Sequence, residues 1–162
     1  TGSLELLATM PVTPTQIIVG KWLAAVALLA AGLAMTFTYP VALRYLAVDG
    51  VDLGPIAGGY LGLFMMGAAF AAIGTACSAL TRYQVLAFLL AFVLCMSPWA
   101  MGYLLPALPA QAVPVVQYFT FEYHFANLAR GVLDSRSLVF FGSVIAVALR
   151  VAVLTLQHQR LS

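Results

Sequence analysis

Long stretches without a charged side chain constrain this chain more than any other feature of its sequence. No Asp, Glu, Lys, Arg or His lies between Lys21 and Arg44, between Asp52 and Arg82, or between Arg82 and Glu122. A helix needs about 20 mostly apolar residues to cross about 30 Å of hydrocarbon. Each of these stretches is therefore long enough to hold a membrane-spanning helix.

The composition agrees with a membrane environment. Apolar residues make up 64% of the chain and charged residues only 7%, whereas about 25% of the residues in a soluble domain are charged. The mean hydropathy is +1.04 and the net charge is +2. Because no block of charge is present, these values exclude a water-soluble domain, a disordered tail and a nucleic-acid-binding module. We therefore expect the lipid bilayer as a partner of this chain, and we expect no nucleic-acid partner.

The sequence predicts four membrane-spanning helices, over residues 18–43, 56–80, 85–105 and 138–156. Strands of a membrane barrel would alternate apolar and polar residues, whereas residues 85–94 are apolar at every position. The predicted fold class is therefore all-α, a polytopic membrane helix bundle. All of the chain is expected to belong to a single transmembrane domain.

Small residues recur at helical spacing in the second predicted span, at Gly58, Gly62, Gly67 and Gly74. Residues without bulky side chains let two membrane helices approach closely. Because such pairs are common in membrane helices, we interpret the pattern as packing within the bundle.

Arg150 is the one charge that lies well inside a predicted span. A charge within the membrane is costly, so Arg150 is a candidate functional residue. It also lies about two turns from the end of its span, and its long side chain could extend to the interface instead. A structural ion pair is the third interpretation.

Residues 1–20 lie before the first span and are broken by Pro11 and Pro14. Proline interrupts a helix and also suits the first position of a new one. Thr13 is therefore expected to cap a helix that begins at Pro14. A broken amphipathic segment of this kind is typical of a membrane surface, and Lys21 marks the interface where the first span enters.

Residues 106–137 form the second stretch outside the predicted spans. Three prolines near its start exclude one continuous helix, and aromatic residues are dense in its second half. This composition is typical of an interfacial or re-entrant layer. Two interpretations stay open, an aromatic belt that closes one end of the bundle and a gate for a substrate. The residues singled out for either role are His124, Phe125, Arg130, Gly131 and Asp134.

Sequence motifs for catalysis are absent. The chain contains no GxxxxGK[ST] phosphate loop, no HExxH, no CxxC and no GxSxG. Glu122 and His124 make half a metal site at best, and a structural hydrogen bond is the expected role of His124. Cys77 and Cys95 fall inside predicted spans, where packing is their expected role. We therefore expect no catalytic residue, no metal site and no cofactor bound by this chain.

Two runs of sequence resemble the permeases of ABC-2 type transporters. Residues 2–24, GSLELLATMPVTPTQIIVGKWLA, are similar to the segment that leads into the third span of those proteins. Residues 124–141, HFANLARGVLDSRSLVFF, are similar to the stretch before the last span in the gliding-motility and nitrous-oxide-reductase-maturation branch of the family. The two runs occur in the order expected for that family.

The resemblance implies a topology and a location. Such permeases have six spans, so two further N-terminal spans, on the order of 80 residues, are expected to precede the four seen here. Residues 1–21 and the C-terminal tail would lie in the cytoplasm, and residues 106–137 outside. The expected location is the inner membrane of a prokaryotic cell, and export is the expected direction of transport.

The resemblance also implies partners. A separate ATP-binding cassette subunit would hold ATP and Mg²⁺, and a second permease copy or a paralogue would complete the pathway. The coupling segment over residues 1–20 would contact the ATPase through Glu5, Leu6, Leu7 and Pro11, next to Lys21. An anchoring or assembly subunit is the alternative function. A membrane-embedded enzyme is a weaker alternative, because it would need ionisable residues that converge within the bilayer.

Overall fold

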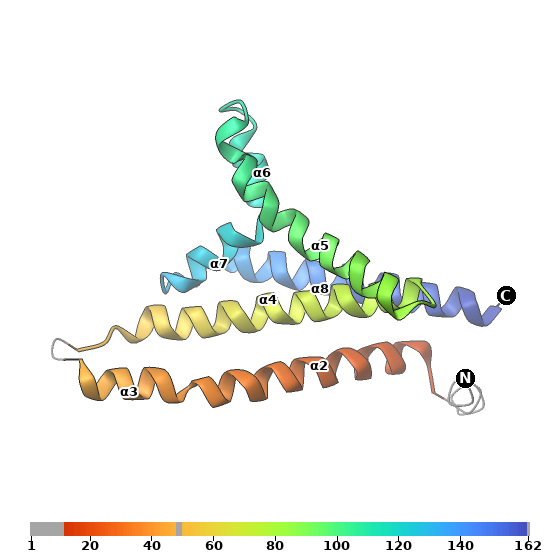
Figure 1. Ribbon diagram of the computed structural model, residues 1–162, viewed down its shortest axis with the longest axis horizontal. Coiled ribbons are helices and arrows are strands. Elements are labelled where there is room, and N and C mark those ends of the chain that lie inside the picture. Colours follow the sequence, from red (N-terminus) through yellow and green to blue (C-terminus); the bar gives the residue numbers. More distant parts are fainter. Residues whose placement is uncertain (1–11, 48–49, 162) are drawn as a thin grey trace.

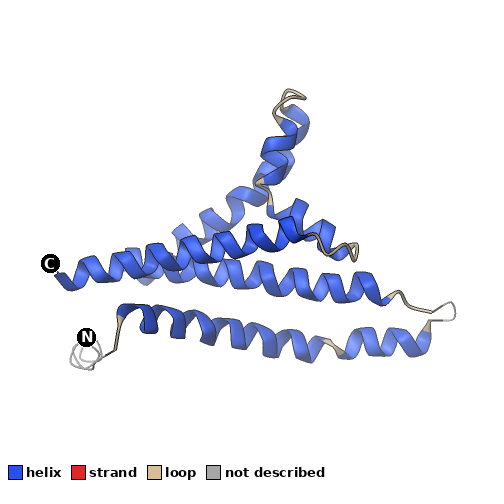
Figure 2. Ribbon diagram, turned by 180° about the vertical axis from the view of Figure 1, so that it is seen from behind, coloured by secondary structure: helices blue, strands red, loops and turns tan. Residues whose placement is uncertain are grey.

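The computed structural model describes residues 12–47 and 50–161, and in this part of the chain every regular element is a helix (Figure 2). The all-α prediction is therefore confirmed for the described residues. The helices are α2 (Pro14–Thr36), α3 (Thr38–Leu46), α4 (Leu53–Leu80), α5 (Gln84–Leu104), α6 (Val113–Tyr118), α7 (Phe121–Ala129) and α8 (Ser135–Leu161), with a 3-10 turn, η1 (Leu105–Ala107), after α5.

Four helical stretches are long and apolar enough to cross a membrane, which is the architecture of a multi-pass membrane protein. They are Pro14–Leu46, Leu53–Leu80, Gln84–Ala107 and Ser135–Gln159. Each includes the whole of one predicted span, and the first, second and fourth begin three or four residues earlier than predicted.

Side-chain caps determine where two of these stretches begin. Thr13 Oγ1 accepts a hydrogen bond from Gln16 N, and the Gln16 side chain accepts one from Thr13 N, with Pro14 at the first helical position. This capping box satisfies backbone N–H groups that the first turn leaves free, and it confirms the predicted cap. Asp52 caps α4 through a hydrogen bond from Gly54 N.

The first predicted span consists of two helices in the structure, α2 and α3, with a break at Phe37 between them. Pro40 has no N–H to donate to the carbonyl of Thr36, four residues earlier. At the same break, the hydroxyl groups of Thr36 and Thr38 donate to the carbonyls of Leu33 and Met35. The two helices remain nearly in line (Figure 1).

Helix α4 is the centre of the structure and packs against α2, α5, α7 and α8. Its contact with α8 uses alanines, Ala72 and Ala76 from α4 and Ala148 and Ala152 from α8, around the buried Ile18 of α2. Small side chains let these helices pack closely. The first helix begins and α8 ends at the same end of the bundle (Figure 1).

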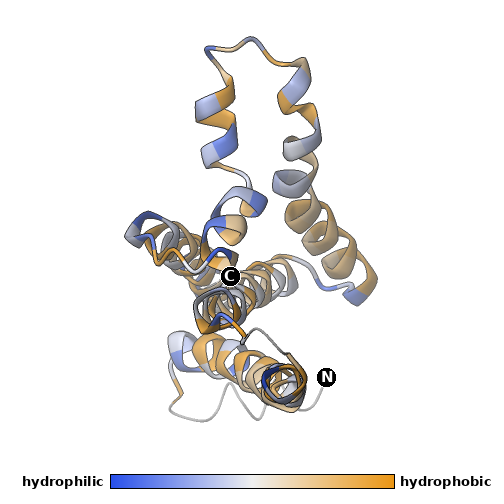
Figure 3. Ribbon diagram, turned by 90° about the vertical axis from the view of Figure 1, so that its left-hand side faces the viewer, coloured by the Kyte–Doolittle hydropathy of each residue, from blue (hydrophilic) through white to orange (hydrophobic). Residues whose placement is uncertain are grey.

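Helices α5 and α6 leave this bundle. Helix α5 begins beside the end of α4 and then diverges, and α6 returns toward the bundle beside it (Figures 1 and 3). Pro98 lies inside α5 and cannot bond the carbonyl of Leu94. The Ser97 hydroxyl donates to that carbonyl at 3.3 Å. The helix therefore continues past its proline.

A carboxylate between α4, α5 and α7

Helix α7 lies on the N-terminal half of α4, where glycines let the two backbones come together. A Cβ atom added at Gly58 would overlap the carbonyl oxygen of Leu128, and one added at Gly62 would lie 3.1 Å from the ring of Phe125. After α7 the chain turns at Gly131, whose φ of +79° favours glycine. An added Cβ there would lie 2.9 Å from the backbone carbon of Gly54.

The other two glycines of the predicted packing face differ from each other. A Cβ atom added at Gly67 would overlap the side chain of Leu29 on α2. Nothing lies within 4 Å of one added at Gly74. The glycines of α4 thus face two different helices, α7 near its start and α2 near its middle.

His124 ties α7 to its neighbours. Its imidazole Nε2–H donates to the carbonyl of Tyr118 at 2.7 Å, which leaves Nδ1 to accept from the Ser137 hydroxyl at 3.1 Å. The ring stacks on Phe140 with the ring centres 4.1 Å apart. His124 and Ser137 are both fully buried. One side chain therefore joins the end of α6, the middle of α7 and the start of α8.

Burial also affects the charge of His124. Removal from water lowers the pKa of its imidazole, although the Tyr118 carbonyl and the negative charge of Asp134 act in the opposite direction. Both ring nitrogens already have partners, so His124 is a structural hydrogen-bonding residue. A metal ion would need a free nitrogen on this ring, and among the described residues no group of three His, Cys, Asp or Glu side chains could hold one.

Glu122 lies on the other side of α7 and faces α4 and α5. It lines a cavity of about 360 Å³ together with Leu63, Met66 and Phe70 of α4, Met96 and Trp99 of α5, and Phe125 of α7. Its Oε2 atom lies close to the backbone of Gly102, because a Cβ added at that glycine would be 2.8 Å away. The carboxylate is exposed and borders this mostly apolar cavity.

A second cavity, of about 280 Å³, also includes Glu122. Its lining is about half polar and comes from the ends of α5 and α6 and from α7. The residues are Gly102, Leu105, Gln117, Thr120, Tyr123, Ala126, Asn127 and Arg130. Within the described residues neither Glu122 nor Arg130 has a side-chain hydrogen bond or an ion pair. Glu122 is thus an unpaired carboxylate at the junction of an apolar and a polar cavity.

The remaining residues of the predicted gate have local roles. Phe125 packs against Gly62, and Arg130 forms the C-terminal end of α7. Asp134 accepts a hydrogen bond from the backbone N–H of Arg136 at the start of α8. Four of the five gate residues thus hold or bound α7, and Arg130 also lines the polar cavity.

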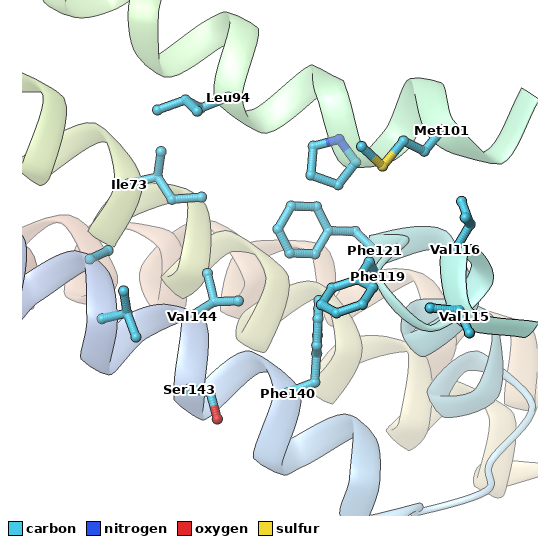
Figure 4. Close-up of a pocket in the computed structure, with 13 residues that line it drawn as sticks. Ile73, Leu94, Met101, Val115, Val116, Phe119, Phe121, Phe140, Ser143 and Val144 are labelled. Carbon is cyan, nitrogen blue, oxygen red and sulfur yellow. The ribbon is translucent and has the colours of Figure 1, made fainter. Parts of the chain in front are cut away.

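A third cavity, of about 700 Å³, lies between α5, α6 and α8 and is almost entirely apolar. The rings of Phe119, Phe121 and Phe140 project into it (Figure 4). Its one hydroxyl, of Ser143, already donates to the carbonyl of Val139 at 2.7 Å. No charged side chain lines this cavity.

Lys21 and Arg150 both lie at the end of the bundle where α2 begins. Lys21 Nζ donates to the Ser78 hydroxyl at 2.9 Å. Arg150 lines a groove with Thr15 and Val19, in the first turns of α2. It makes no ion pair with any residue that the structure describes.

The predicted coupling residues Glu5, Leu6, Leu7 and Pro11 lie outside the described residues. The two cysteines are buried and free.

The sequence analysis considers Glu122 only as half of a metal site and does not predict its position beside α4 and α5. The sequence does contain a pattern that indicates how α7 packs. Phe121, His124, Phe125 and Leu128 follow the i, i+3, i+4, i+7 pattern of a helix that buries one face. Three of these four are fully or nearly fully buried. The pattern thus indicates that α7 packs against the bundle through this face, and Glu122 follows directly after the first of the four residues.

Comparison of the chain with family models, with curated proteins and with solved structures finds no match.

Proposed function

We propose that this chain is the membrane-spanning permease subunit of an ATP-binding cassette transporter, driven by a separate ATP-binding subunit and working in export. The resemblance of residues 2–24 and 124–141 to ABC-2 type permeases is the basis of the proposal. The topology of the four spans gives the strongest structural support. Four spans return the chain to the end where it began (Figure 1). A coupling segment before Val12 and the C-terminal tail would then share one face.

The basic residues outside the spans divide evenly between the two ends. Lys21, Arg82 and Arg160 belong to the end where α2 begins, and Arg44, Arg130 and Arg136 belong to the other side. Enrichment of basic residues on the cytoplasmic side therefore does not decide the orientation, and only the resemblance to ABC-2 type permeases favours the first end as the cytoplasmic one. Arg150 lines a groove beside the first turns of α2, and this position favours interfacial extension as its role.

The proposal gives α7 a re-entrant path. Its first turn contacts Phe70, near the middle of α4, and its last turn contacts Gly58, near the start of α4. If α4 crosses the bilayer, α6 and α7 dip from the outer surface toward its middle. Backbone that is not part of a spanning helix is tolerated at that depth where protein buries it, and α7 is covered by α4 and α8.

The mechanism would couple ATP binding to tilting of the spans. Closure of two ATP-binding subunits, which hold ATP and Mg²⁺, would push two coupling segments together and alternate access to a pathway between two permease copies. Glu5 would meet a basic group of the ATPase, and Leu6 and Leu7 would enter an apolar cleft. Pro11 would make the connection to α2 rigid.

The test is co-expression with the ATP-binding subunit encoded beside this gene. We expect the two proteins to purify together, and Glu5→Arg to abolish co-purification or the stimulation of ATP hydrolysis. Asp52→Arg reverses an equal charge at the opposite end of the bundle and serves as the control. If no ATPase is retained, or if both reversals act alike, the coupling assignment fails and an anchoring subunit becomes the better explanation.

A further inference from the structure

A groove of about 240 Å³ runs between α2 and α8 at the end of the bundle where α2 begins. Thr15 and Val19 of α2 form one wall. The other wall belongs to α8 and consists of Ala146, Leu149, Arg150 and Val153. Among the described residues that line this groove, Arg150 alone is charged. The groove therefore combines a cation with a mostly apolar surface.

The groove lies where the first span begins. Thr15 is the second residue of α2, and the first stretch that is apolar enough to cross a membrane starts at Pro14. Arg150 is exposed, and long basic side chains near the end of a span extend their charge to the interface. We therefore expect the Arg150 guanidinium at the depth of the lipid phosphates.

No protein group neutralises this cation within the described part of the chain. Arg150 has no hydrogen bond or ion pair there, whereas Lys21 and Arg82 add positive charge at the same end of the bundle. The acidic residues that the structure describes lie away from this end, at the start of α4, in α7 and just before α8, and they are Asp52, Glu122 and Asp134. An anionic partner complements this distribution of charge.

We infer that an anionic phospholipid occupies the groove, with its phosphate against the Arg150 guanidinium. A guanidinium group can bond two phosphate oxygens at once, and the Thr15 hydroxyl on the facing wall supplies a further donor. The side chains of Val19, Leu149 and Val153 would lie along the start of an acyl chain. Basic pockets between membrane helices are known to bind anionic headgroups in this way.

The lining also indicates why a zwitterionic lipid fits less well. The ammonium group of such a lipid offsets the charge of its own phosphate. Among the described residues that line the groove there is no carboxylate and no aromatic ring to hold that ammonium group. An anionic headgroup therefore gains more from Arg150.

This inference requires only that α2 and α8 cross a bilayer. It does not rest on the permease proposal, because lipid binding needs neither an ATPase nor transport. The larger cavity beside α5 supports no comparable inference, since no charged side chain lines it to select an occupant.

The experiment uses Trp22 as the reporter. Trp22 lies one turn after Val19 and packs against the buried cluster that includes Val153. The chain has two tryptophans, so Trp99→Phe leaves only Trp22. We would place this protein in phosphatidylcholine nanodiscs and replace a rising fraction of the lipid with phosphatidylglycerol that is brominated near the headgroup end of its chains. Bromine quenches tryptophan fluorescence on contact.

Phosphatidylcholine with the same brominated chains is the matched lipid. We expect phosphatidylglycerol to bind beside Trp22 about three- to tenfold more strongly than phosphatidylcholine, the usual effect of one basic side chain at an anionic lipid surface.

Variants test the role of Arg150. Arg150→Gln should abolish the preference for phosphatidylglycerol, and Arg150→Lys, which keeps the charge, should retain part of it. Arg82→Gln removes an equal charge at the same end but outside the groove, and it should leave the preference unchanged. Ala146→Phe, at an exposed position of the groove, fills the groove and keeps the cation. It should also reduce the preference, and it replaces Arg150→Gln if that variant does not yield monodisperse protein.

Several outcomes would overturn the inference. Equal quenching by the two brominated lipids would remove the site. Equal losses in Arg82→Gln and Arg150→Gln would assign the preference to the overall charge of this end, and an unchanged preference in Arg150→Gln or Ala146→Phe would place the lipid elsewhere. Loss of the preference on addition of inorganic phosphate, with the ionic strength matched by chloride, would assign the site to a free anion instead of a lipid.

Discussion

Helices α7 and α5 both pack against α4, but they are held in opposite ways. Helix α7 is short, and glycines in α4, the buried His124 and the aromatic side chains of α8 surround it. Helix α5 is long, yet Cys95 is its only buried residue, whereas eight residues of α4 are buried. Almost all of its large apolar side chains are exposed, among them Phe88, at 69%.

The two helices therefore obtain their stability from different contacts. Contacts within this chain fix the position of α7, because its backbone approaches α4 and its polar side chain is satisfied inside the protein. Helix α5 instead presents hydrocarbon outward, which is stable only against lipid or another protein. Its position therefore depends on lipid or on another protein more than the position of α7 does.

The largest expected difference between the two regions comes from removing one aromatic side chain from each. Phe141→Ala deletes a fully buried ring that stacks on Phe121, and we expect it to lower the free energy of unfolding by about 3–5 kcal/mol. Phe88→Ala, on the exposed face of α5, should cost under about 1 kcal/mol in a bilayer, because lipid replaces the lost contacts. Thermal unfolding in nanodiscs measures both. Equal losses would mean that α5 is packed as firmly as α7.

Removing the hydrogen bonds of His124 tests whether they hold α7 in place. His124→Ala leaves the Ser137 hydroxyl and the Tyr118 carbonyl without their partner and opens a space beside Phe140. We expect a loss of about 2–4 kcal/mol in the free energy of unfolding. The control is His158→Ala, at an exposed position of α8. If both variants unfold at the same temperature, His124 does not hold α7.

The same histidine provides a second readout through pH. Because burial lowers the pKa of His124 in the folded protein below the value of 6.5 for a free side chain, the unfolded chain binds the proton more readily. Its stabilising contribution is complete above about pH 6.5 and declines as the pH falls through the folded-state pKa. Unfolding temperatures between pH 7 and pH 5 should show this decline, and His124→Asn should reduce it.

Adding a single methyl group tests the close approach of α7 to α4. Gly58→Ala places a Cβ against the backbone carbonyl of Leu128, and we expect a loss of about 1–3 kcal/mol because a backbone cannot repack as a side chain does. Gly74→Ala meets nothing within 4 Å and should be neutral or slightly stabilising, since alanine favours a helix over glycine. Thermal unfolding distinguishes them. A stable Gly58→Ala protein would show that α7 shifts freely on α4.

Local features were predictable where neighbouring residues decide them. Charge-free runs marked the four long helices, and Thr13 with Pro14 marked the start of the first one. The break at Phe37 was missed, although Pro40 lies three residues later. A proline near a helix start is tolerated, and one in its interior is not. Whether Pro40 lies near a helix start or in a helix interior cannot be told until the position of the helix start is known.

The candidate site was only half predictable. His124, Phe125 and Arg130 were singled out from the aromatic segment, but the position of Glu122 beside Met66 and Phe70 was not. Those two residues lie more than fifty positions before Glu122 in the chain, and no local pattern reports which helices will face each other.

Charge and hydropathy act on each segment separately, so the amino-acid sequence is enough to predict a helical chain suited to a membrane. Capping involves residues three positions apart, so helix starts are predictable as well. The position of α7 along α4, the burial of His124 between three helices and the position of Glu122 between two cavities are visible only in the folded structure. These depend on backbone approach and side-chain packing between distant segments, and such contacts exist only once the chain has folded.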